Sequence, residues 1–271
     1  IETASLDCRL LLTKSIKKNK TLQNHEYINI TNKEIKKFKY LIRERLAGKP
    51  VSRIINKRNF WKMEFKLNEA TLDPRPDSET LIYAVLNHFI NKLQPLKILD
   101  LGSGSGCLGL SLLDEYQNSK VSFFDTSQKS LEIVKNNSLK FGLSERSKFL
   151  QLNWKDDNWD KSLIKIENDT KFDIIISNPP YIPTDDIKKL QKEVKEYDPP
   201  IALDGGKDGM DAYKLIIPKL RNLIKTNGKI FLEIGKGQEN CVSKIGIEQG
   251  LKLIELQKDL SGVNRVIVFY Y

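Results

Sequence analysis

The chain has 271 residues, of which 39% are hydrophobic and 30% are charged, a composition typical of a globular protein. Basic side chains exceed acidic ones by 10, and the whole excess lies in residues 1–70, because residues 71–271 hold 28 of each sign. No apolar run reaches the roughly 18 residues that span a bilayer, and three scattered cysteines argue against a disulfide framework, so we expect a cytoplasmic protein.

Residues 1–52 are expected to form a small helical domain. Apolar residues recur at three- and four-residue spacing from Ile35 onward, and Thr31 followed by Glu34 has the pattern of a capping box at a helix start. Gly48-Lys49-Pro50 should end this helix, since glycine favours the position after a helix and proline cannot continue one. The other face of the helix carries basic residues, namely Lys36, Lys37, Lys39, Arg43 and Arg45.

Residues 53–73 are predicted to form a β-hairpin that links two domains, because residues 60–67 alternate loosely between apolar and polar side chains. The segment Asp73-Pro74-Arg75-Pro76-Asp77 is expected to be extended, since each proline restricts the residue before it. A helix should then begin at Ser78 and run through Phe89.

From residue 96 onward, apolar runs suited to strands alternate with amphipathic segments suited to helices. Strands are predicted at 96–101, 121–124, 148–152, 172–177, 228–233, 251–256 and 265–270, and helices at 106–116, 130–141, 213–225 and 240–249. This succession predicts an α/β fold for residues 74–271, with a Rossmann-like, mostly parallel sheet. The last two strands have no helix between them, so they should form an antiparallel C-terminal edge.

A glycine-rich loop, Asp100-Leu101-Gly102-Ser103-Gly104-Ser105-Gly106, follows the first strand of this sheet. Glycines let the backbone turn sharply and let a ligand approach without a Cβ in the way, and the helix start beyond them offers free N–H groups. Asp125 ends the next strand, where a carboxylate can accept both hydroxyls of a ribose. A nucleoside-containing cofactor is therefore expected to contact Asp100, Gly102, Ser103, Gly104, Ser105, Gly106 and Asp125.

The position of Asp100 favours one such cofactor over another. A carboxylate just before the first glycine suits the sulfonium and ammonium groups of S-adenosylmethionine and would repel a pyrophosphate. However, residues 104–109 also match the dinucleotide fingerprint G-x-G-x-x-G, so a nicotinamide-dependent dehydrogenase is an alternative.

The tetrapeptide Asn178-Pro179-Pro180-Tyr181 directly follows the strand predicted at 172–177. In an open α/β sheet, ligands bind at the carboxyl ends of the strands. The two prolines leave carbonyl oxygens as acceptors, Asn178 adds a side-chain oxygen, and Tyr181 can pack against a flat group. These residues can hold both hydrogens of a planar NH₂ group. Fixed acceptors would then aim the nitrogen lone pair at a methyl group and stabilise the charge that develops.

Residues 99–106 and 177–182 resemble motifs of the methyltransferases that modify amino groups with S-adenosylmethionine. Three further stretches resemble one branch of these enzymes, the HemK/PrmC family of release-factor glutamine methyltransferases, and they are residues 7–12, residues 59–61 with 74–79, and residues 259–265. The Asn-Pro-Pro-Tyr motif alone is shared with adenine-N6 methyltransferases, whereas the segments at 74–79 and 259–265 are more selective. The resemblance spans essentially the whole chain.

This resemblance implies methylation of the glutamine amide nitrogen in the Gly-Gly-Gln loop of peptide chain release factors. Gly102 to Gly106 would wrap the methionine part of S-adenosylmethionine, Asp125 would hold its ribose, and Trp154 would lie beside its adenine. The glutamine would be bound by Asn178, Pro179, Pro180 and Tyr181, of which Asn178, Pro179 and Tyr181 would act in catalysis and Asn178 would also contact the cofactor. Arg75 and Glu79 are expected to shape the pocket.

One segment departs from the family pattern. Tyr197-Asp198-Pro199-Pro200-Ile201 stands where a Glu-Pro-Arg sequence is usual, so the acid is shortened and the basic residue is lost. A contact from this position to the substrate loop is therefore in doubt.

The excess positive charge can be interpreted in more than one way. It could face an acidic protein partner, bind RNA phosphates or form an ordinary solvated surface. Because every motif that carries chemistry follows residue 71, we favour a docking domain for the release factor, and we expect a monomer. An adenine-N6 nucleic-acid methyltransferase is the alternative enzyme, although no base-reading module is evident. Two histidines, His25 and His88, and three cysteines are too scattered for a metal site.

Overall fold

The computed structural model describes residues 3–18, 21–23 and 27–271, so His25 lies outside the described part. The N-terminal part contains helices α1 (Ala4–Ser15), α2 (Asn32–Leu46) and α3 (Val51–Ile55). The predicted capping box is confirmed, because the Thr31 side chain accepts from the Glu34 N–H and the Glu34 side chain accepts from the Thr31 N–H. Leu11, Leu41 and Ile54 form the small core that joins the three helices.

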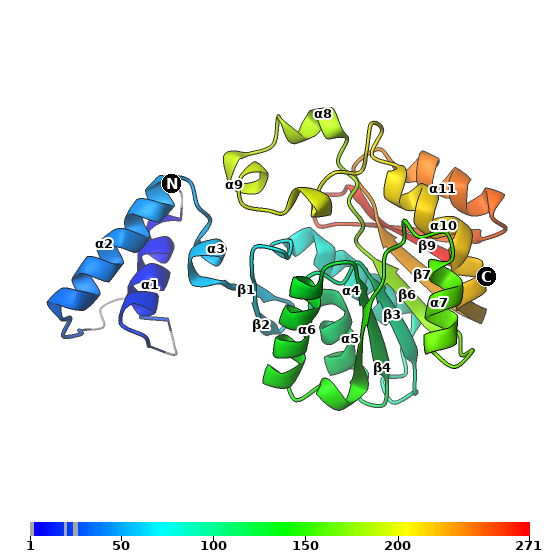
Figure 1. The fold of residues 1–271 in the computed structure, drawn as a ribbon, viewed down its shortest axis with the longest axis horizontal. Coiled ribbons are helices and arrows are strands. Elements are labelled where there is room, and N and C mark those ends of the chain that lie inside the picture. Colours follow the sequence, from blue (N-terminus) through cyan, green and yellow to red (C-terminus); the bar gives the residue numbers. More distant parts are fainter. Residues whose placement is uncertain (1–2, 19–20, 24–26) are drawn as a thin grey trace.

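The predicted hairpin consists of β1 (Lys57–Phe60) and β2 (Met63–Lys66), which pair antiparallel. It lies between the N-terminal helices and the larger domain (Figure 1). Helix α3 was not predicted, and it crosses the expected boundary between residues 52 and 53. Its five residues are too few to show a helical repeat, and its core contact through Ile54 is tertiary.

The described residues of the larger domain form a seven-stranded sheet with the order β5-β4-β3-β6-β7-β9-β8. Its strands are β3 (Lys97–Leu101), β4 (Lys120–Asp125), β5 (Ser147–Gln151), β6 (Phe172–Ser177), β7 (Ile224–Glu233), β8 (Lys252–Lys258) and β9 (Asn264–Tyr270). The first five are parallel, whereas β9 is antiparallel to both β7 and β8. The predicted fold class, including the antiparallel C-terminal edge, is therefore confirmed.

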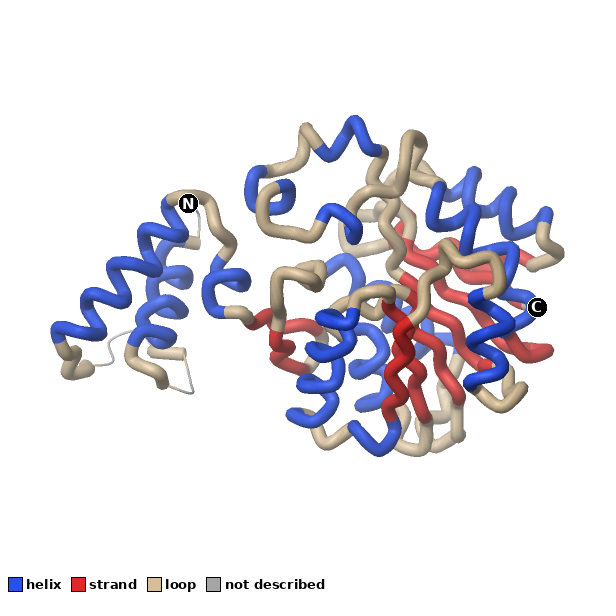
Figure 2. Tube along the Cα trace, viewed as in Figure 1, coloured by secondary structure: helices blue, strands red, loops and turns tan. Residues whose placement is uncertain are grey.

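Helices cover both faces of this sheet, which lies between them in Figure 2. They are α4 (Glu79–His88), α5 (Cys107–Glu115), α6 (Gln128–Lys140), α7 (Trp159–Ile166), α10 (Asp211–Leu223) and α11 (Glu239–Glu248). Alternate residues of each central strand face opposite sides, as Ile98 packs in the core that contains α4, α5 and α6, and Leu99 in the core that contains α7, α10 and α11. Among the described residues, no helix is long and apolar enough to cross a membrane.

The strand order places the two chemical motifs side by side. The chain runs outward from β3 to β4 and β5 and then returns to β6 on the opposite side of β3. The glycine loop after β3 and the Asn-Pro-Pro-Tyr motif after β6 therefore meet at a topological switch point, where open α/β sheets bind ligands.

The segment after that motif contains short helices that were not predicted, α8 (Thr184–Ile187) and α9 (Lys192–Lys195). The two ends of this segment lie side by side, because Ile182 N–H donates to Leu203 O at 3.0 Å and Gly205 N–H donates to Ile182 O at 2.9 Å. Four-residue helices show no period in the sequence. Helix α7 was also missed, and β7 begins four residues before its predicted start because Ile224 pairs with Phe172.

Candidate active site

The glycine loop turns tightly from β3 into α5. Gly102, Gly104 and Gly106 all have positive φ values, of 73°, 54° and 77°, a conformation that glycine adopts without strain. The N–H groups of Gly102 and Ser103 donate to Phe124 O at 2.8 and 3.1 Å, which fastens the loop to the end of β4. A Cβ at Gly102 would lie 2.9 Å from the Trp154 ring, so glycine is required there for space as well as for conformation.

Asp125 ends β4 with its carboxylate held by backbone N–H groups. Oδ2 accepts from Gly104 N–H at 2.9 Å and Oδ1 accepts from Ser127 N–H at 2.8 Å. Burial raises the pKa of Asp125, and these hydrogen bonds oppose that shift. The carboxylate is thus oriented before any ligand arrives.

Asp100 has a different place from the one expected. It is 1% exposed and accepts from Gly109 N–H at 3.0 Å, underneath the loop. A Cβ at Gly109 would lie 2.8 Å from the Asp100 carboxylate, so the two pack closely. Burial raises the pKa of Asp100 to about 7. Its influence on a ligand would act through the loop and through its charge rather than by contact.

A cavity of about 780 Å³ joins the two motifs. Of the residues predicted from the sequence, it is lined by Gly102, Ser103, Gly104, Ser105, Asp125, Trp154, Asn178 and Pro180, and not by Asp100, Gly106, Pro179 or Tyr181. Trp154 forms a flat wall, since its ring lies parallel to that of Phe124, with 6.1 Å between centroids and 4° between planes. The volume suits a nucleoside-sized ligand beside a side chain.

The Asn-Pro-Pro-Tyr motif contributes Asn178 and Pro180 to the wall of this cavity. Asn178 Nδ2 donates to Ser78 Oγ at 3.1 Å, so Asn178 Oδ1 is left for a ligand. Within the described part of the chain, no group donates to Asn178 Oδ1 or to the Pro179 carbonyl oxygen. Tyr181 lies behind them, where its hydroxyl donates to Glu233 Oε1 at 3.1 Å and its carbonyl accepts from Gln238 Nε2 at 2.8 Å.

Arg75 and Glu79, both expected to shape the pocket, lie in different places. Arg75 lines the cavity, as expected. Glu79 does not, because its Oε1 accepts from Trp61 N–H at 2.7 Å and so ties the hairpin to the start of α4.

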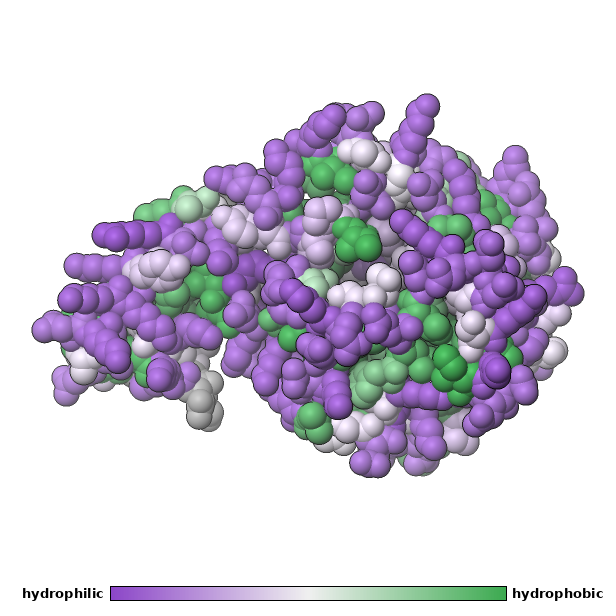
Figure 3. Space-filling view, viewed as in Figure 1, coloured by the Kyte–Doolittle hydropathy of each residue, from purple (hydrophilic) through white to green (hydrophobic). Residues whose placement is uncertain are grey.

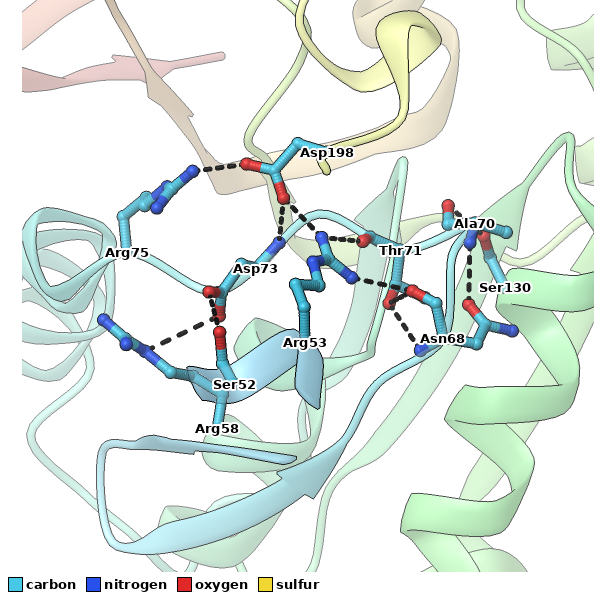
Figure 4. Close-up of polar contacts among 10 residues, drawn as sticks. All are labelled: Ser52, Arg53, Arg58, Asn68, Ala70, Thr71, Asp73, Arg75, Ser130 and Asp198. Atoms are coloured by element: carbon cyan, nitrogen blue, oxygen red, sulfur yellow. Dashed lines mark hydrogen bonds and ion pairs between the residues drawn. The ribbon is translucent and has the colours of Figure 1, made fainter. Parts of the chain in front are cut away.

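Asp198, in the segment that departs from the family pattern, is buried and paired with two arginines (Figure 4). Arg53 NH2 and Arg75 NH2 each bond one oxygen of its carboxylate, and Asp73 N–H donates to Oδ1 at 3.3 Å. Pro200 and Ile201, just beyond it, line the cavity. The shortened acid therefore anchors this segment to the linker, beside the pocket.

No site role was predicted for Ser78, Asp198 or Glu233. One signal could have pointed to Glu233, since it ends the predicted strand 228–233, whose carboxyl end must lie at the same edge as that of 172–177. Within residues 3–18, 21–23 and 27–271, no three His, Cys, Asp or Glu side chains are grouped so as to hold a metal ion.

The burial of Asp100 predicts a pH-dependent stability. An unfolded carboxyl loses its proton near pH 4, whereas that of Asp100 keeps it to about pH 7, so the folded protein binds more protons in between and loses stability as the pH rises. In Asp100→Asn, we expect the fall in unfolding free energy between pH 5 and pH 8 to be smaller than in the wild type by about 1–3 kcal/mol.

Urea denaturation of the cofactor-free protein at both pH values measures this difference. Glu233 also titrates in this range but is present in both proteins, so its contribution cancels. An unchanged pH dependence in Asp100→Asn would mean that the carboxyl is ionised in the folded protein at pH 5.

Comparisons with known proteins agree with this geometry. A family model described as the PrmC N-terminal domain matches residues 1–55, and one described as the methyltransferase small domain matches residues 77–196. The release factor glutamine methyltransferase of Bradyrhizobium diazoefficiens is 35% identical over 271 residues, a match that covers 98% of this chain and 88% of that protein.

Other relatives are longer. A bifunctional methyltransferase of Rickettsia felis is 34% identical over 299 residues, and the match covers 99% of this chain but 54% of the relative, so this chain spans about half of its length. Among solved structures, a methyltransferase from Pyrococcus furiosus has a TM-score of 0.53 at 14% identity, over 87% of this chain and 98% of that chain, and shares the fold.

Proposed function

Because this chain belongs to the release factor glutamine methyltransferase family, we propose that it methylates the glutamine side chain in the Gly-Gly-Gln motif of peptide chain release factors. The methyl donor proposed is S-adenosylmethionine. The observation that carries this proposal is Asn178, whose Oδ1 accepts from no group in the described part of the chain and which lines the same cavity as the glycine loop. Membership of a methyltransferase family removes the reason to consider a nicotinamide-dependent dehydrogenase.

The residues present fit S-adenosylmethionine. Gly102 to Ser105 line the cavity and would hold the methionine part, and Gly102 leaves room beside Trp154 that a Cβ would fill. The pre-oriented Asp125 carboxylate would accept the ribose hydroxyls, and the flat face of Trp154 would lie beside the adenine. When bound, this cofactor supplies an electrophilic methyl group.

The protein's own contribution is to orient the glutamine amide. An amide nitrogen is a poor nucleophile because its lone pair is delocalised. Asn178 Oδ1 and the Pro179 carbonyl can each accept one amide hydrogen, which fixes the NH₂ group and favours rotation of its lone pair toward the methyl group. The same dipoles stabilise the positive charge that develops on nitrogen. No base is needed before transfer, since the proton becomes acidic once the nitrogen is methylated.

Incubation of the protein with a purified release factor and isotopically labelled S-adenosylmethionine tests this function. We expect label in the Gly-Gly-Gln peptide, located by mass spectrometry, and none when that glutamine is replaced by glutamate. Absence of label from the wild-type peptide contradicts the proposal. Label on adenine in nucleic acid would instead support the alternative enzyme, and label in a ribosomal protein would identify a different protein substrate.

The N-terminal helices are proposed to dock the release factor through their positive charge. Figure 3 shows a mainly hydrophilic surface over these helices. Lys36 and Lys39 are exposed on α2, one turn apart, whereas Lys37 donates to Lys14 O at 3.2 Å. Arg45 is not free either, because it pairs with Asp7 and Glu193. The positive charge available to a partner is therefore smaller than the sequence suggests. We also propose that the enzyme binds the release factor as a monomer.

Reversal of Lys36 and Lys39 to glutamate is expected to weaken binding of the release factor by about tenfold at low ionic strength and less at high salt. Binding of S-adenosylmethionine should not change, since both lysines lie outside the cavity. Lys161 and Lys165, exposed on α7, provide a control with the same change in net charge. Calorimetry of the variants at two salt concentrations measures the effect. If both double variants bind the release factor with the same affinity, the positive charge of α2 is only a solvated surface.

A further inference from the structure

Glu233 is a buried acid that the mechanism above does not use. It is 1% exposed and ends β7, which pairs in parallel with β6, so it lies beside the start of the Asn-Pro-Pro-Tyr motif. Its backbone carbonyl accepts from Tyr213 Oη at 2.7 Å. The end of β7 that carries this carboxyl group is therefore fixed next to the motif.

This carboxyl group contacts Tyr181, the last residue of the motif. Tyr181 Oη donates to Glu233 Oε1 at 3.1 Å. Glu233 Oε2 is buried and has no aligned hydrogen-bond partner among the described residues. The Ser78 side chain lies next to this carboxyl group, since a hydrogen bond from Ser78 lowers the pKa of Glu233.

Ser78 connects Glu233 to Asn178. It is 2% exposed, and its hydroxyl does not cap α4, so its hydrogen is available for another partner. A serine hydroxyl has one hydrogen to donate and lone pairs to accept. If that hydrogen points to the Glu233 carboxylate, Ser78 Oγ can only accept from Asn178, as the 3.1 Å bond from Nδ2 requires. Asn178 Oδ1 must then face the cavity.

We propose that Glu233 is a positioning residue for methyl transfer, which holds Tyr181 directly and, through Ser78, sets the orientation of the Asn178 amide. This inference rests on the proposed function. It assigns Glu233 no contact with the substrate and no proton transfer. Its effect is that the side-chain oxygen of Asn178, rather than its NH₂ group, meets the glutamine.

The charge state of Glu233 should matter for this role. Burial raises its pKa to about 7, opposed by Ser78, Arg265 and Tyr181 and assisted by Asp77. Tyr213 and Cys107, the other titratable groups that interact with it, have raised pKa values and stay neutral near pH 7. A protonated Glu233 can donate to Ser78, which frees the serine hydrogen for Asn178 Oδ1 and permits the amide to flip. Transfer should therefore slow as the pH falls through about 7.

The test is the variant Glu233→Gln, assayed for kcat against pH with release factor and cofactor both saturating. Glutamine has the same shape, but its NH₂ group must donate to Ser78 or Tyr181 and so disturbs one of the two contacts. We expect kcat at pH 8 to fall by at least about tenfold, the decline of kcat below pH 7 to disappear, and the dissociation constant for S-adenosylmethionine to stay unchanged. Asp100 also titrates near pH 7, so Asp100→Asn is assayed beside it, and only a decline in kcat that Asp100→Asn keeps and Glu233→Gln loses is assigned to Glu233.

Ser78→Ala separates the two contacts, since it removes the link to Asn178 and leaves the bond between Tyr181 and Glu233. It should lower kcat and weaken its pH dependence, again without loss of cofactor binding. If Glu233→Gln keeps the wild-type kcat, or loses stability and cofactor affinity while its pH profile is unchanged, the inference is wrong. No transfer to the release factor by the wild-type protein would overturn the proposed function itself, and this role with it.

Discussion

Replacement of Asn178 by alanine is expected to lower kcat for release factor methylation by about 10²–10³-fold, the loss typical of one preorganised hydrogen-bonding group in an active site. Asn178 Oδ1 is the side-chain acceptor that the Asn-Pro-Pro-Tyr motif offers to an NH₂ group, and the variant removes it without adding bulk. The affinity for S-adenosylmethionine should change little, because Asp125, Trp154 and the glycine loop remain. Single-turnover labelling of the release factor and calorimetry with the cofactor measure the two quantities.

Asn153→Ala is the matched control for this experiment. Asn153 lines the same cavity but lies next to Trp154, and its Oδ1 already accepts from Lys155 N–H at 3.0 Å. Its loss should weaken cofactor binding rather than kcat. A variant of Asn178 that keeps wild-type kcat would show that the backbone carbonyls alone position the amide.

The sheet could be predicted because its information is local. Continuous apolar runs such as Ile174-Ile175-Ile176 identify buried central strands, and the alternation with helices requires parallel pairing. The glycine loop and the Asn-Pro-Pro-Tyr motif were also placed correctly at strand ends, since both motifs are contiguous. Strand order then brings them to one cavity without further sequence information.

The groups that support the site could not be predicted in the same way. Ser78 and Asn178 are 100 residues apart, and Tyr181 and Glu233 are 52 apart, so their contacts exist only in the folded sheet. Asp100 shows a different limit. The sequence places an acid beside the first glycine, but only the fold shows that its side chain points under the loop to Gly109.

Asp198 is a third case, in which a departure from the family pattern has a structural role. The departure from the usual Glu-Pro-Arg sequence put a contact between this segment and the substrate loop in doubt. The structure instead gives the carboxylate three partners, Arg53 and Asp73 of the linker and Arg75 just beyond it (Figure 4). Because Arg75 and Ile201 line the cavity, this cluster sets the position of two walls of the pocket.

Asp198→Ala is accordingly expected to destabilise the protein by about 3–5 kcal/mol, the cost of leaving a buried ion without its partner. The Arg53 side chain is only 6% exposed and would retain two carbonyl acceptors, Asn68 O and Thr71 O, but no anion. Chemical denaturation monitored by tryptophan fluorescence measures the free energy of unfolding. A joint change of Arg53 and Asp198 to methionine and leucine should restore most of it, since neither charge is then buried alone.

Glu193→Gln is the control, because this acid belongs to the same segment and pairs with Arg45 of the N-terminal helices at 2.5 Å. Its side chain is 42% exposed, and Arg45 keeps Asp7 as a second partner at 2.8 Å. Solvent and the remaining carboxylate compensate the loss, so the expected destabilisation is below about 1 kcal/mol. If the two variants lower the free energy of unfolding equally, burial does not decide the strength of these ion pairs. Asp198 would then not be the anchor of the pocket wall.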